Sequence, residues 1–129
     1  MGDLLLDLAT YLQVKGVVGS DGVDVFRDFS PDTPDSVVVL FEYAGTPDSV
    51  SEVGARSIQV TVRDPNAEQA RRKAWDIYNV LNIPEDRIIY LTSSRWAIIL
   101  PRQTPFKVGV DEQNRILWGF NLAVTTYGD

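Results

Sequence analysis

Five aspartates gather in a short segment rich in turn residues, and they form the densest set of metal-ligating side chains in the sequence. They are Asp21, Asp24, Asp28, Asp32 and Asp35. A calcium loop needs carboxylates at alternating positions, a glycine turn and a closing bidentate glutamate. Here the spacing is irregular and no glutamate closes the loop. The pattern therefore favours solvated turn carboxylates and helix caps over a metal site.

Two residue types that carry much of protein catalysis are missing, because the 129-residue chain contains neither cysteine nor histidine. The common zinc and haem sites and the Ser-His and Cys-His nucleophilic pairs are therefore excluded. Gly16, Gly19 and Gly22 follow a predicted helix instead of a strand, which disfavours a phosphate loop. We predict no catalytic residue, no cofactor and no metal. An enzyme that uses carboxylates and a metal, with Asp24 or Asp28 essential, remains the third of three alternatives.

Side chains that favour protein interfaces are better represented. Arginine outnumbers lysine nine to three, and Arg and Trp are enriched at interface hot spots. The basic run 71–73 indicates a solvated helix face first, a contact with an acidic subunit second and DNA third. Of the three tryptophans, Trp118 fits an inward strand position and Trp75 lies beside an apolar helix stripe. Trp96 is the preferred interface candidate.

The net charge of −6 is distributed unevenly along the chain. Residues 1–54 hold ten Asp and Glu against two basic residues, whereas residues 55–129 hold eight against ten. This imbalance would let the acidic part of one subunit meet the basic part of another. The alternative is a solvated surface whose charge is uneven by chance.

Two segments show the 3.6-residue apolar period of a helix that packs on a core. The first covers residues 4–12, and Gly16 offers its C-cap. The second begins at Asp64-Pro65-Asn66, where Asp or Asn supplies the N-cap and the proline suits the first helical position. It ends before Pro84.

Strands are predicted where apolar residues alternate or run together between turn residues. Their ranges are 23–27, 37–43, 57–63, 88–91, 96–100, 106–110 and 116–124, with a polar loop at 44–55 and a hairpin turn at 111–114. This order predicts one α+β domain over residues 1–129. We expect one mainly antiparallel β-sheet with two principal α-helices packed on it.

The start of the chain does not resemble a targeting signal. Asp3 and Asp7 stand where a signal peptide carries positive charge. No apolar stretch approaches the roughly 20 residues that span a bilayer. We therefore expect a soluble protein without a membrane partner.

Several segments together resemble a family of siphophage proteins called minor capsid or tail terminator proteins. The short leading helix is followed by Phe29-Ser30-Pro31-Asp32-Thr33-Pro34-Asp35 and the apolar strand 37–43. The turn Gly45-Thr46-Pro47 and the strand 58–63 come next. The helix with Ala70, Ala74 and the run 77–82 then leads to Pro105-Phe106 and a long final strand.

The resemblance implies a virion structural protein without catalytic residues, assembled in the bacterial host cytoplasm. Its subunits would form a hexameric ring that caps the tail tube and docks to the head-completion or connector protein. Genomic DNA would pass through an acidic lumen without specific binding. The residues expected at a subunit or tail-tube interface are Thr46, Pro47, Asp48, Ser49, Val50, Glu52, Arg71, Arg72, Trp96, Arg102, Phe106 and Arg115. A small oligomeric binding or regulatory module of ferredoxin-like type is the second alternative.

Overall fold

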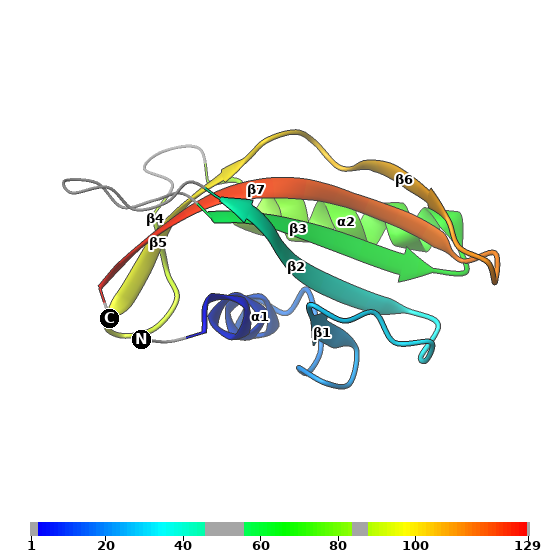
Figure 1. The fold of residues 1–129 in the computed structure, drawn as a ribbon, viewed down its shortest axis with the longest axis horizontal. Helices are drawn as coiled ribbons and strands as arrows, with labels where there is room; N and C mark the ends of the chain where they lie inside the picture. The colour runs from blue at the N-terminus through cyan, green and yellow to red at the C-terminus, as the bar shows by residue number, and fades with distance from the viewer. Residues whose placement is uncertain (1–2, 46–55, 84–87, 129) are drawn as a thin grey trace.

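The computed structural model describes residues 3–45, 56–83 and 88–128. Within these ranges, two helices and seven strands follow one another (Figure 1). In order they are α1 (Leu4–Val14), β1 (Val25–Arg27), β2 (Val37–Gly45), β3 (Arg56–Asp64), α2 (Ala67–Leu81), β4 (Ile88–Tyr90), β5 (Arg95–Pro101), β6 (Phe106–Val110) and β7 (Ile116–Gly128).

All seven strands belong to one curled sheet with the order β1-β2-β3-β7-β5-β4, and β6 pairs with β7 off this path. β7 is long enough to pair along one side with β3 and along the other with β5 and then β6. β1 and β2 are parallel, whereas the other described pairs are antiparallel. The α+β class is confirmed, but the sheet is mixed, so the prediction of a mainly antiparallel sheet is confirmed only in part.

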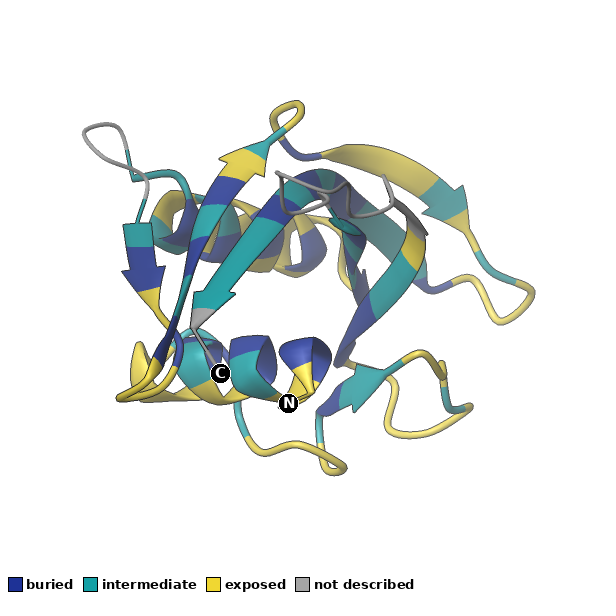
Figure 2. Cartoon of the chain, turned by 60° about the vertical axis from the view of Figure 1, so that its left-hand side comes forward, coloured by how far each residue is buried: buried dark blue, intermediate teal, exposed yellow. Residues whose placement is uncertain are grey.

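Both helices cover the same face of the sheet. In β3, Ile58, Val60 and Val62 form one cluster with apolar residues of α1 and α2, as their alternation predicts. The corresponding residues of β7 are Phe120 and Leu122, which are 0% exposed. Figure 2 shows buried residues on the helix sides that face the sheet and exposed residues on the outer loops. The other face of the central strands is not covered by either helix.

Caps fix where the two helices begin. The Asp3 carboxylate accepts hydrogen bonds from the backbone amides of Leu5 and Leu6, which makes Asp3 the N-cap of α1. Asn66 caps α2 by accepting from the amide of Gln69. The prediction that Pro65 occupies the first helical position is wrong, because Pro65 precedes the cap. The sequence offered Asp64 and Asn66 as equal cap candidates, and a cap at Asp64 would have put Pro65 inside the helix.

Candidate functional site: the two charged sides of the molecule

The acidic segment 17–36 forms the β1 side of the molecule, and three of its aspartates make different contacts. Asp21 binds the guanidinium of Arg27, with 2.9 Å between its Oδ1 and the Arg27 Nε. Asp28 accepts a hydrogen bond from the backbone amide of Glu42 at 3.1 Å. The Asp24 carboxylate fits against Gly19, and one of its oxygens is buried without a hydrogen-bond partner among the described residues. Within the described ranges, no three acidic side chains lie close enough together to hold a metal ion.

Two buried arginines hold the turn that follows Phe29, and we call Arg63 and Arg115 the arginine clamp. Their side chains are only 4% and 5% exposed. Arg63 donates to the Pro34 carbonyl at 2.6 Å and to the Ser30 hydroxyl at 3.2 Å. Arg115 donates to the Asp32 carbonyl. Strand β3 and the start of β7 thus bind a turn that lies about 30 and 80 residues upstream of them.

The electrostatics of the clamp follow from its burial. Burial and the charge of Arg115 lower the pKa of the Arg63 guanidinium from its ordinary value. For Arg115, burial acts in the same direction, but the hydrogen bond and charge of Asp111 outweigh it and raise the pKa. The Arg115 Nε lies 2.7 Å from Asp111 Oδ2. Asp111 is therefore the nearest carboxylate to Arg115, and Asp35 pairs with the same guanidinium at 3.3 Å.

The stability that Asp111 contributes should depend on pH. Burial raises the pKa of the Asp111 carboxyl, but hydrogen bonds from the Arg115 backbone, the Arg115 side chain and the Gln113 amide lower it below its ordinary value of 3.8. A carboxyl with a depressed pKa in the folded state stabilises the fold above its unfolded pKa and loses this effect as the pH falls through the folded pKa.

We therefore expect Asp111→Asn to lower the free energy of unfolding at pH 7. The difference from the wild type should stay constant down to about pH 4 and shrink below it, as measured by urea unfolding at each pH. A difference that grows on acidification would contradict the assignment. Glu112→Gln, at an exposed position in the same turn, is the matched control.

The turn that the clamp holds begins with an exposed aromatic side chain. Phe29 is 61% exposed, and its ring meets the ring of Phe26 edge-on at a centroid distance of 6.4 Å. The exposed carboxylates of Asp28 and Asp32 flank it in the sequence. We call Phe29 with Asp28 and Asp32 the acidic knob.

The opposite side of the molecule carries basic and apolar residues from α2 and β6. Arg71 and Lys107 are exposed and make no ion pair within the part of the chain that the structure describes. Trp75, one turn after Arg71, is 37% exposed. In β6, Phe106 and Val108 are 40% and 44% exposed. Phe106 pairs with Gly119, and Val108 lies next to Gly119, so both are on the face of the sheet opposite to Lys107 and α2. We call Arg71, Trp75 and Lys107 the basic patch.

The structure separates the residues that the sequence predicts at an interface. Arg71 and Arg72 are exposed on α2, and Arg72 pairs with Glu68 one turn earlier. Trp96 is half-buried and stacks on Tyr127 at a centroid distance of 4.3 Å. Six further residues lie outside the described residues: Thr46, Pro47, Asp48, Ser49, Val50 and Glu52.

The remaining three predicted residues lie close to β7. Phe106 is paired with Gly119 of β7 at the start of β6. Arg102 is exposed, and its side chain donates to the Ser57 hydroxyl at 3.0 Å. Arg115 is buried and binds the turn inside its own chain, as described above. Phe29, Lys107 and Arg63 are not among the residues that the sequence predicts at an interface. Phe29 had a signal, because it starts a turn with two prolines and several aspartates, and such connecting segments run over the surface.

Comparisons with known proteins were made for the whole chain. The model of one family, described as "Bacteriophage tail terminator protein", matches residues 11–127. A chain in the structure "Virion of native gene transfer agent (GTA) particle" has a similar fold, with a TM-score of 0.61 and 18% sequence identity. The similarity covers 95% of this chain and 96% of that one. No curated protein matches the chain. Among the described helices, none is both long and apolar enough to span a membrane.

Proposed function

We proceed from the fact that the chain belongs to the bacteriophage tail terminator family, and we propose that it is one subunit of a ring that caps the tail tube. As a member of this family, the protein is a structural component of the phage virion, at the tail, and associates with other virion components. The ring would stop growth of the tube and form the joint to the head connector. A hexamer is the stoichiometry that we propose.

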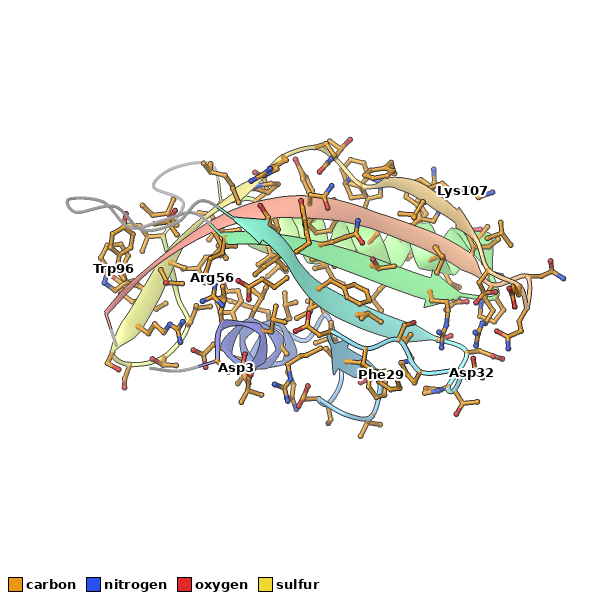
Figure 3. The ribbon with its side chains drawn as sticks, in the orientation of Figure 1. Asp3, Phe29, Asp32, Arg56, Trp96 and Lys107 are labelled. Carbon is orange, nitrogen blue, oxygen red and sulfur yellow. The ribbon has the colours of Figure 1, made fainter. Side chains whose placement is uncertain are left out.

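The single observation that carries this proposal is that one molecule presents two different surfaces on opposite sides. The acidic knob follows β1, and the basic patch belongs to α2 and β6; Figure 3 shows Phe29 and Asp32 on the lower side of the molecule and Lys107 on the upper side. A contact between two different patches of identical subunits is heterologous, and it closes into a ring when its rotation divides a full turn. Two unlike patches of complementary charge fit this arrangement better than a two-fold dimer.

The protein would act by geometry alone, without making or breaking a bond. Residues 1–129 would fold as one domain and present these surfaces at a fixed angle. The net charge of −6 suits a lumen through which DNA passes without sticking, because like charges repel. Arg102 and Trp96 are candidates for contacts with the tube or connector.

The test of this function is whether the protein forms rings. The purified protein is expected to form closed rings alone or on adding tail tube protein, as seen by negative-stain electron microscopy and by mass from light scattering. Tubes assembled with the protein present should be capped at one end. A protein that stays monomeric with the tube and connector proteins, or that turns over a substrate, would contradict the proposal.

A further inference from the structure

We propose that adjacent copies dock with the acidic knob of one subunit against the basic patch of the next. This inference rests on the proposed ring and specifies which surfaces form its subunit contact. The occupant of each surface is thus a second copy of this chain.

The sheet order places the two surfaces on opposite sides. β1 is one end of the strand order, and β6 lies beyond β7 on the other side of β3. Figure 3 shows the labelled Phe29 and Asp32 on the lower side of the molecule and Lys107 on the upper side. A knob on one copy can therefore reach the patch of a neighbour while its own patch remains free for a third copy.

The contacts of α2 show that Arg71 and Trp75 lie on the flank that faces away from the acidic segment. Tyr78, one turn after Trp75, meets Phe120 of β7 edge-on at 5.5 Å, and the Trp75 ring meets the Tyr78 ring at 5.3 Å. On the other flank, the Lys73 ammonium donates to the Val17 carbonyl at 3.1 Å. The α2 residues of the basic patch therefore lie toward β7, the strand that pairs with β6.

The patch continues from α2 into β6. Lys107 is paired with Trp118 of β7, a half-buried residue that packs against the core beneath α2. Paired residues share a face of the sheet, so the Lys107 position is on the same face as α2. An ammonium, a guanidinium and the exposed edge of Trp75 together offer the chemistry that recognises carboxylates and an aromatic ring.

The acidic knob provides carboxylates and an aromatic ring in a rigid form. Segment 17–36 holds five aspartates and one arginine, and Arg27 is already bound to Asp3 and Asp21. The arginine clamp binds the Ser30 hydroxyl before Pro31 and the backbone carbonyls of Asp32 and Pro34 after it, so little conformational entropy is lost when the knob docks. Asp32 makes its hydrogen bonds in the clamp through its carbonyl. Its charge also acts on Arg63, but its exposed carboxylate makes no ion pair among the described residues and can meet a cation of a neighbour.

The contact should use side chains and not strand addition. The outer edge of β1 is partly occupied, because Asp21 bridges to Val25 and the Gly22 amide donates to the Val25 carbonyl at 2.8 Å. In β6, the register shifts between Lys107 and Gly109, which is a bulge of the kind that blunts a free strand edge.

Charge reversal tests the pairing. Lys107→Glu and Asp32→Lys should each raise the protein concentration needed for ring formation by at least tenfold. The two variants mixed should recover ring formation, because copies that alternate around a hexamer meet only opposite charges at these two positions. The double variant Lys107→Glu/Asp32→Lys should recover fully, since the pair is restored with its charges exchanged. Lys15→Glu makes the same charge change at the end of α1 and should not weaken assembly.

A thiol cross-link identifies the contact directly, because the wild-type chain has no cysteine. We expect Phe29→Cys and Trp75→Cys chains, mixed in assembled rings, to be joined by a short bismaleimide into covalent dimers, and both substitutions leave the charges of the two surfaces unchanged. Tyr90→Cys is the control, since it is 70% exposed but lies in neither surface. Each variant is first checked by circular dichroism and urea unfolding, so that a loss of fold is not read as a loss of docking.

The outcomes separate this inference from the proposed function. Rings that form normally, tolerate both single charge reversals and give no 29–75 cross-link would overturn the inference while the ring function stands. Cross-links from residue 29 to the tube protein instead of a second copy would also overturn it. If no rings form under any condition, both proposals fail.

Discussion

Asp7→Ala is expected to lower the free energy of unfolding by about 3 kcal/mol, because it leaves the buried guanidinium of Arg95 without its carboxylate. The two side chains are 16% and 3% exposed, and the Arg95 Nη1 lies 3.1 Å from Asp7 Oδ2. The ion pair joins α1 to β5 across 88 positions of the sequence. Its loss should therefore loosen α1 on the sheet, and urea unfolding followed by circular dichroism would measure the effect.

Glu68→Ala is the matched control, because it removes a carboxylate from the first turn of the other helix. Asp7 and Glu68 both lie in the first turn of their helices, so the loss of favourable interaction with the helix dipole is the same. The Glu68 partner, Arg72, is 63% exposed and stays solvated, so we expect a change of about 0.5 kcal/mol or less. Equal effects of the two substitutions would mean that an unpaired, buried Arg95 guanidinium does not lower the free energy of unfolding.

Gly119→Ala is expected to destabilise the protein by about 3 kcal/mol, because the added methyl group has no room. A Cβ at this position would lie 2.4 Å from the Val60 carbonyl oxygen and 3.5 Å from Val108 Cγ2. The carbonyl belongs to the backbone of the neighbouring strand β3, so no side-chain rotation can relieve the contact. The strands would have to separate where β3, β7 and β6 lie side by side, and thermal or urea unfolding should show the loss.

Gly109→Ala supplies the comparison within the same pair of strands. A Cβ there would meet nothing within 4 Å among the described atoms, so we expect stability to stay within about 0.5 kcal/mol or to rise slightly. If the two alanine variants unfold alike, the close approach at Gly119 is not what requires glycine.

The positions of most elements could be predicted because local pattern and tertiary burial agree. The alternation of Ile58, Val60 and Val62 predicts which side of β3 faces the core, and the structure confirms it. In α2 the predicted stripe contains Ala70 and Ala74, both fully buried. The apolar period of the sequence matches the buried side of these elements because the apolar residues are the ones that pack in the core.

The pairing of strands and the positions of surface residues could not be predicted from local patterns of this kind. The parallel pairing of β1 with β2 depends on a turn of about ten residues whose shape is set by Arg63 and Arg115, and no local signal in the sequence links them. Arg115 resembles a surface arginine by its polar neighbours, yet it is 5% exposed. Sequence spacing also could not show that Lys107 lies on the same face of the sheet as α2.

The arginine clamp implies a checkpoint for newly made chains. Residues that shape the turn at Phe29 come from β3 and from the start of β7, so the turn cannot take its final form before the last strand has been synthesised and paired. A truncated or misfolded copy would carry the same aspartates without the rigid presentation that lowers the entropic cost of association. Only completely folded copies would therefore bind a neighbour and enter the assembly.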